Sequence, residues 1–249
     1  MSMIDVSNLT FGYEGSPELI FDHVGFQIDS GWKLGFTGRN GRGKTTFLRL
    51  LQGEYPYSGT ISASVEFEYF PYEVANLSRT GLEVVREIAP EAEDLEIQRE
   101  LGLLDLAERS LELPFSSLSN GERTKVLLAA MFLKENAFLL IDEPTNHLDL
   151  EGRRKLGSYL ARKRGFLLVS HDRAFLDQCV DHILAINRTN IEIQRGNFSS
   201  WWENRRRQDA FELARQEKLQ KDIGRLTESA RRASGWSDRT EKSKFGVDK

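Results

Sequence analysis

Residues 38–45 read GRNGRGKT and have the spacing of a loop that binds phosphate. They match the pattern G-x-x-x-x-G-K-[ST], in which glycines let successive backbone N–H groups surround an anion. Lys44 would reach the outer phosphates, and the Thr45 hydroxyl would bind Mg²⁺. An ordinary glycine-rich turn is the alternative. The predicted nucleotide-binding residues of this stretch are Gly38, Asn40, Gly41, Gly43, Lys44, Thr45 and Thr46.

Two acidic residues follow an apolar run, FLLI at 138–141, and form a Walker B pair. Asp142 suits the second coordination shell of the metal, so that Thr45 and Asp142 are the predicted metal residues. Glu143 suits the base that orients the attacking water. A purely structural pair of acids is the alternative.

His171 follows the apolar run 166–169 and could hydrogen-bond a γ-phosphate, reporting whether that phosphate is present. Isolated histidines are more often structural, and His23 and His182 are interpreted in that way. Tyr13, in the sequence FGY, is a candidate to stack on adenine, with packing in the core as its alternative.

The stretch SSLSNGERTKV at 116–126 has the features of a helix start. Ser119 and Glu122 are spaced as a capping box, in which each side chain satisfies the backbone N–H of the other. Gly121 costs such a helix roughly 1 kcal/mol relative to alanine. Close approach of an anion to the helix N-terminus would explain that glycine.

These residues need a scaffold of parallel strands. The apolar runs 34–37, 138–141 and 166–169 are each followed by polar residues, a pattern typical of buried strands with ligands at their carboxyl ends. Residues 4–9 and 61–67 alternate with a period of two and predict antiparallel strands with one wet face. Residues 74–113 predict short helices.

A different composition begins near residue 201. The chain is charged and helix-forming to about Ala233, and the spacing of Leu219, Ile223, Leu226, Ala230 and Ala233 predicts a short coiled-coil seam. Residues 234–249 predict a polar loop. Residues 203–249 hold 13 basic and 9 acidic residues, whereas the rest of the chain holds 21 and 29. A basic extension on an acidic body suggests a polyanionic partner, with a solvated charged helix as the alternative.

The composition of the 249 residues excludes several other classes. The single cysteine, Cys179, excludes an internal disulfide and a multi-cysteine metal site. No apolar run approaches the ~20 residues that span a bilayer, and the first residues do not resemble a signal peptide. A cytoplasmic location is therefore expected.

The motifs together resemble those of an ABC-type ATPase. They are the P-loop, LSNGE at 118–122, LLIDEPTNHLD at 139–149 and VSHDRAFLD at 169–177. The resemblance implies an α/β P-loop NTPase fold, with a mixed or parallel core sheet, an antiparallel β subdomain, a helical subdomain at about 74–134 and a C-terminal helical extension. It also implies ATP and Mg²⁺ as cofactors, an ATP-binding domain over 1–198, and Glu143 and His171 as catalytic residues.

In ABC ATPases two such domains meet head to tail. The resemblance implies that one signature helix caps the nucleotide held by the P-loop of the other domain. Ser119, Asn120, Gly121 and Glu122 would thus face a partner's nucleotide, and Asp149 would belong to the D-loop. The chain would hold two half-sites, completed by a second ABC domain in a longer chain or in a homodimer.

The residues PTNHLD at 144–149 resemble the ABC-F family. That resemblance makes 199–249 a basic helical linker between two domains, truncated here, which would contact the ribosome, its rRNA and the P-site tRNA and no membrane. FTGRNGRGKTTF and EFEYFPYEV are similar to Lsa-like resistance proteins, which release lincosamides, pleuromutilins and streptogramin A. A housekeeping ABC-F translation factor is one alternative, and a membrane transporter subunit is another.

Three departures from the ABC pattern affect these expectations. Tyr72 stands where the Q-loop glutamine is usual, so the metal contact and the water positioning of that glutamine do not carry over to this residue. Asn120 and Glu122 replace glycine and glutamine in the signature, which adds a negative charge near a phosphate. The sequence contains no second P-loop. A DNA-maintenance ABC ATPase would carry its coiled coil inside the nucleotide domain, whereas the helix here follows it.

Overall fold

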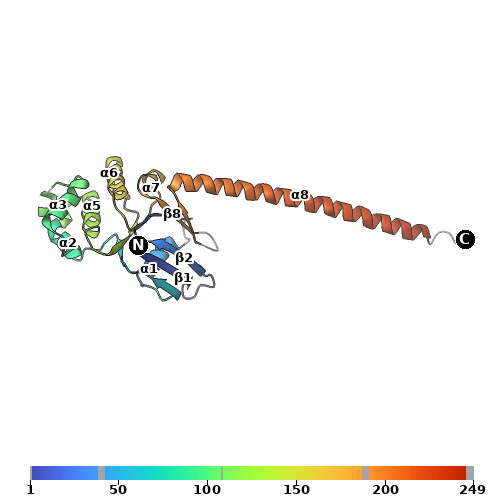
Figure 1. Cartoon of the computed structure of the whole chain (residues 1–249), viewed down its shortest axis with the longest axis horizontal. Coiled ribbons are helices and arrows are strands. Elements are labelled where there is room, and N and C mark those ends of the chain that lie inside the picture. Colours follow the sequence, from blue (N-terminus) through green and yellow to red (C-terminus); the bar gives the residue numbers. More distant parts are fainter. Residues whose placement is uncertain (1, 39–42, 108, 187–190, 245–249) are drawn as a thin grey trace. The chain divides into compact units, whose positions relative to one another are not determined.

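The computed structural model describes residues 2–38, 43–107, 109–186 and 191–244, with side chains as far as 228. The chain forms two compact units, Met1–Trp201 and Trp202–Lys249. The first unit contains every strand of the described residues and all of the helices except most of the last one (Figure 1). Within the described residues, no helix has both the length and the apolar character needed to cross a membrane.

The larger sheet of the first unit has six strands in the order β5-β6-β7-β3-β8-β9. Neighbouring strands are parallel except for β8 and β9. The strands predicted around 34–37, 138–141 and 166–169 are confirmed as β3, β6 and β7, which are adjacent. The six strands are β3 (Lys33–Thr37), β5 (Glu66–Phe70), β6 (Ala137–Asp142), β7 (Phe166–Val169), β8 (His182–Ile186) and β9 (Ile191–Arg195).

The central strands of this sheet are buried on both faces because alternate side chains enter two different cores. From β6, Leu139 and Ile141 pack with the helices on one face, whereas Phe138 and Leu140 pack with α1 and the smaller sheet on the other. Because these strands are parallel, their carboxyl ends lie at one common edge of the sheet, where polar residues follow them. The helices flanking these strands are α1 (Lys44–Leu51), α6 (Leu150–Ala161) and α7 (Arg173–Cys179).

The smaller sheet is antiparallel, with the order β2-β1-β4. Its strands are β1 (Met3–Phe11), β2 (Phe21–Asp29) and β4 (Ser58–Ser62). The antiparallel strand predicted at 4–9 is confirmed. The single antiparallel strand predicted at 61–67 is wrong, because the chain leaves the smaller sheet after β4 and enters the larger one as β5, parallel to β6. Alternation identifies a half-buried strand but not the direction of its partner.

A group of short helices confirms the pattern predicted for 74–113 (Figure 1). Buried Glu100 on α3 ties this group to α6, because it accepts a 2.6 Å hydrogen bond from the Tyr159 hydroxyl and another from Lys163. The elements of the group are α2 (Gly81–Ile88), α3 (Asp94–Leu103), α4 (Arg109–Glu112), the 3₁₀ turn Phe115–Ser117 and α5 (Asn120–Met131).

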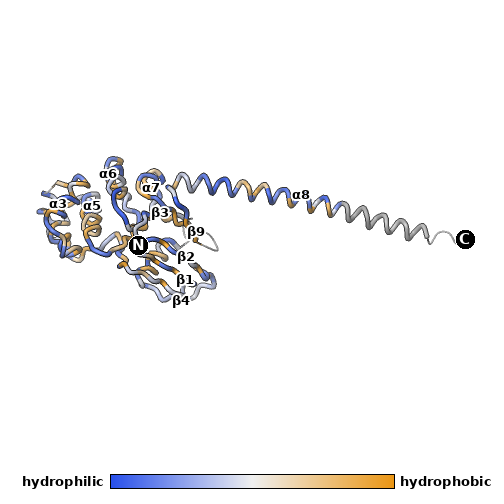
Figure 2. Tube along the Cα trace, viewed as in Figure 1, coloured by the Kyte–Doolittle hydropathy of each residue, from blue (hydrophilic) through white to orange (hydrophobic). Residues whose placement is uncertain are grey.

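The last helix, α8 (Phe198–Lys244), is a single helix of 47 residues. At 1.5 Å per residue it is about 70 Å long. The polar loop predicted from residue 234 is wrong as far as Lys244, since arginine, lysine and glutamate favour helix and a lone glycine costs only about 1 kcal/mol. Most of its described residues are hydrophilic (Figure 2). The apolar residues Leu219, Ile223 and Leu226, which belong to the predicted seam, are exposed.

Candidate nucleotide-binding site

A cavity of about 640 Å³ opens at the edge where the parallel strands end. It brings together eight residues predicted from the sequence, namely Tyr13, Gly43, Lys44, Thr45, Thr46, Asp142, Glu143 and His171. It is also lined by Ile20, Tyr69, Pro71 and Val169, which the sequence analysis did not select. The predicted Asn40 and Gly41 lie outside the described residues.

The N-terminus of α1 faces this cavity and has the chemistry of an anion site. Gly43 precedes the helix with φ 88°, and a Cβ there would lie 2.4 Å from Cγ2 of Ile20, so only glycine fits. No side chain of the described residues caps the helix, so the N–H groups of its first turn can bind a phosphate.

Lys44, the first residue of α1, also lines the cavity. Its Nζ donates a 2.9 Å hydrogen bond to the carbonyl oxygen of Gly38. Burial lowers the pKa of Lys44, and the nearby carboxylates of Glu143 and Asp142 oppose that effect. Burial lowers the local dielectric constant around the ammonium group. A phosphate in the cavity would therefore be attracted to the charged lysine more strongly than in water.

Thr45 and Asp142 are placed together and present oxygen atoms to the cavity. The Thr45 hydroxyl donates to Oδ2 of Asp142 over 3.3 Å, although the two residues are 97 positions apart. Hydroxyl and carboxylate oxygens are the ligands that Mg²⁺ prefers beside substrate phosphates, so this donor set fits that cation. A bound Mg²⁺ would neutralise negative charge on the phosphates.

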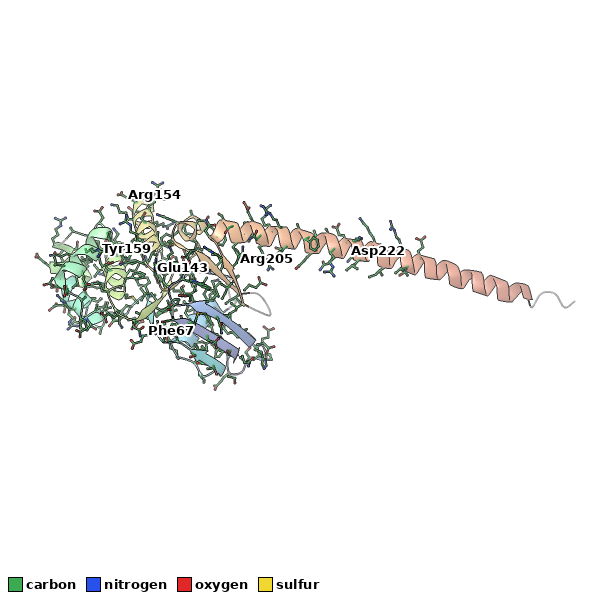
Figure 3. All side chains as sticks on the ribbon, viewed as in Figure 1. Phe67, Glu143, Arg154, Tyr159, Arg205 and Asp222 are labelled. Atoms are coloured by element: carbon green, nitrogen blue, oxygen red, sulfur yellow. The ribbon has the colours of Figure 1, made fainter. Side chains whose placement is uncertain are left out.

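Glu143 has the environment of a general base. It is in the left-handed region with φ 49°, and its Oε1 is buried without a hydrogen bond from any described residue. Burial raises its pKa, and the adjacent His171 opposes this. The His171 backbone N–H donates to Oε2 over 3.4 Å, while its exposed ring places Nε2 3.5 Å from Oε1. Glu143 is labelled within the first unit in Figure 3.

Tyr13 borders the cavity and is 45% exposed. Its hydroxyl shares a 2.8 Å hydrogen bond with the hydroxyl of Thr46, and its ring packs edge-on against Phe11 and Tyr55. This arrangement holds an aromatic face next to the P-loop. Both the stacking role and the packing role suggested by the sequence are compatible with it.

The capping box predicted at the start of α5 is confirmed. The Glu122 backbone N–H donates to Oγ of Ser119 over 3.2 Å, and the Ser119 N–H donates to Oε2 of Glu122 over 2.9 Å. The Ser119 hydroxyl also donates to Oε2 over 2.7 Å, and these hydrogen bonds lower the pKa of Glu122. Glu122 is thus drawn back toward its own helix.

The signature residues do not line the cavity that holds Lys44. The lining includes neither Ser119, Asn120, Gly121 and Glu122 nor Asp149. Gly121 instead approaches the segment after Walker B, since a Cβ there would lie 3.3 Å from Cδ2 of Leu148. Asp149 caps α6, accepting a 2.7 Å hydrogen bond from the N–H of Gly152.

Tyr69 is the polar residue of the cavity that sequence reasoning missed. Its hydroxyl donates to Oδ2 of Asp142 over 3.1 Å. Burial, followed by the charge of Asp142, raises its pKa to about 12, so it is a donor at neutral pH. Correct assignment of β5 as a parallel neighbour of β6 would have placed Tyr69 beside Asp142 at the strand ends.

Comparison with known families and proteins gives a consistent result. Residues 21–146 match the family described as "ABC transporter". The chain is 32% identical, over 90% of its length, to the "Ribosome protection protein VmlR" of Bacillus subtilis (strain 168), and covers 41% of that protein. It is 30% identical, over 88% of its length, to the "ABC transporter F family member 5" of Arabidopsis thaliana, and covers 32% of that protein.

Among solved structures, a similar fold occurs in "Structure of a bacterial Atm1-family ABC exporter with ATP bound". The TM-score is 0.66 at 19% identity, and the match covers 82% of this chain and 40% of the other. The predicted fold class is therefore confirmed. The chain spans less than half the length of either of the two sequence relatives named above.

Proposed function

The chain belongs to the ABC transporter family as one of its ATP-binding domains, and from that premise we propose that it hydrolyses ATP in a site completed by a second ABC domain. Glu143 takes a proton from the attacking water and Lys44 binds the outer phosphates. His171 is close to Glu143 and would contact the γ-phosphate. Thr45 and Asp142 would hold Mg²⁺ beside the phosphates.

The placement of the signature motif supports the need for a second domain. The described lining of the cavity includes P-loop residues 43–46 and the Walker B pair but not Ser119 or Gly121. A helix N-terminus capped at Ser119 and kept small at Gly121 can accept an anion carried by another domain. The complete protein would therefore pair this domain with a second one, in the same chain or in another copy.

We further propose that the domain acts on the ribosome as an ABC-F protein. The observation that carries this proposal is that α8, a long charged helix, directly follows the ATP-binding unit. Asn146 and His147 fit the same assignment, as do the names of two relatives, one a ribosome protection protein and the other an F family member. In this proposal α8 begins the linker at 199–249 and contacts rRNA and the P-site tRNA.

Displacement of antibiotics from the peptidyl transferase centre is the finer form of this proposal. The name of VmlR, a ribosome protection protein, supports it. The F family relative supports a general role in translation equally well. The Lsa-like specificity for lincosamides, pleuromutilins and streptogramin A stays a prediction, which release of a radiolabelled lincosamide from ribosomes by the ATP-loaded protein would test.

Ribosome binding is expected to depend on the nucleotide. In a centrifugation assay, the chain should sediment with 70S ribosomes at least about 10-fold more in Mg-ATP than in ADP, because closure on ATP orients the linker. Hydrolysis would be blocked with Glu143→Gln during the assay. Equal recovery with ATP, ADP and no nucleotide would contradict a role on the ribosome while leaving ATP binding intact.

A further inference from the structure

Tyr69 lies at the end of β5, directly beside the end of β6. Parallel pairing sets Tyr69 opposite Leu140 and Phe70 opposite Ile141, so Asp142 follows immediately on the neighbouring strand. The Tyr69 hydroxyl reaches across this edge and donates to Oδ2 of Asp142 over 3.1 Å. Phe67, two residues earlier on β5, is labelled in Figure 3.

Asp142 receives both of its described hydrogen bonds on the same oxygen. Thr45 donates to Oδ2 over 3.3 Å, and Tyr69 donates to Oδ2 as well. A carboxylate oxygen has two lone pairs, so these two donors saturate Oδ2. Among the described residues no donor engages Oδ1, which leaves that oxygen available to a cation.

The two donors come from different sides of the site. Thr45 belongs to the P-loop helix and is expected to contact the cation itself, through an oxygen lone pair. Among the described residues, the Tyr69 hydroxyl makes one hydrogen bond, the one to Asp142. Its phenol therefore reaches the carboxylate from β5, outside the P-loop.

Tyr72 faces a different partner. Its hydroxyl donates to Oε1 of Glu87 over 3.4 Å, and Tyr72 is absent from the residues that line the cavity. Tyr69 and Tyr72 are thus two phenols three residues apart, of which only one touches Walker B. They form a matched pair for experiment.

We propose that Tyr69 is a positioning residue that orients Asp142 for the divalent cation accompanying the nucleotide. The inference rests on the proposed ATP-binding function. Loss of the hydroxyl leaves Oδ2 with one donor and lets the carboxylate turn away from the orientation that presents Oδ1. The affinity for the cation then falls, whereas affinity for nucleotide without metal is retained.

The test is a titration of Mg²⁺ into the chain with a fluorescent N-methylanthraniloyl derivative of ATP. Tyr69→Phe is expected to raise the Mg²⁺ concentration at half-maximal binding by about 10-fold, as expected for loss of a hydrogen bond to a charged group. Binding of the same nucleotide in EDTA is expected to stay within about 2-fold of wild type, because the P-loop contacts are unchanged. Tyr72→Phe is expected to match wild type in both arms.

Each other outcome overturns the inference. A Tyr69→Phe chain with the wild-type Mg²⁺ midpoint would show that the phenol does not position Asp142. An equal loss in EDTA and in Mg²⁺ would show a general structural role, and an equal effect of Tyr72→Phe would show that the position is not specific. A wild-type chain that binds no nucleotide under either condition would overturn the proposed function and this inference together.

Discussion

Replacement of Glu143 by glutamine is expected to reduce ATP hydrolysis by at least about 100-fold, the usual contribution of a positioned general base. The amide keeps the shape of the side chain but cannot accept a proton from water. Oε1 of Glu143 is buried and accepts no hydrogen bond from the residues that the structure describes, and burial raises the pKa of this carboxyl group. Oε1 of Glu143 can therefore accept a proton from water, and the raised pKa makes this carboxylate a stronger base than an exposed glutamate.

Phosphate release measured at saturating ATP would report the rate, and binding of a fluorescent ATP derivative should be unchanged. Glu135→Gln provides a control with the same chemical change at an exposed site. Wild-type hydrolysis should also fall at low pH, because protonated Glu143 cannot act as a base. Since burial raises the pKa of Glu143, this fall should begin at a higher pH than for a carboxyl group with the ordinary pKa of 4.5. Turnover by Glu143→Gln near the wild-type rate would assign the base to another residue.

Reversal of three basic residues on α8 is expected to weaken ribosome binding by at least about 10-fold and to reduce its dependence on salt. Lys218, Lys221 and Arg225 are spaced at i, i+3 and i+7, so they share one face of the helix. Leu219, Ile223 and Leu226 lie on a different face and are exposed. Phosphate contacts by that basic face would be lost when the three residues become glutamate.

The α8 variant distinguishes a helix that binds phosphates from one that only joins two domains. Arg205 and Arg207 form ion pairs within α8, with Asp209 and Glu203, and are poorer candidates for a phosphate contact. Reversal of Arg154, Arg162 and Arg164, exposed on the first unit, makes the same change in net charge and is expected to leave binding near wild type. Retention of full binding by the α8 variant would support a linker that only joins two domains.

The cavity could be predicted largely because its residues follow buried strands. Three apolar runs were enough to place β3, β6 and β7 together, and parallel strands in one sheet present their carboxyl ends at one edge. Lys44, Asp142 and His171 therefore meet although they are distant in sequence. The capping box at Ser119 could be predicted because it depends on residues three positions apart.

Tyr69 could not be predicted in the same way. Alternation in 61–67 does not reveal that the chain changes sheets between β4 and β5, since side-chain period is the same in parallel and antiparallel pairs. The partner of Gly121 was equally hidden. A Cβ at this glycine would lie 3.3 Å from Cδ2 of Leu148, a neighbour that tertiary packing sets, whereas the ligand expected there from the sequence stays a prediction.

The specific ATPase activity of the chain, measured as its concentration is raised, tests the claim that one chain holds two half-sites. Lys44 and Glu143 line one cavity, and Ser119 is not part of its lining. We expect low activity per chain at low concentration, rising as copies associate in ATP and saturating once they are paired. Fast turnover per chain that stays constant down to concentrations at which the protein is a proven monomer would contradict the claim.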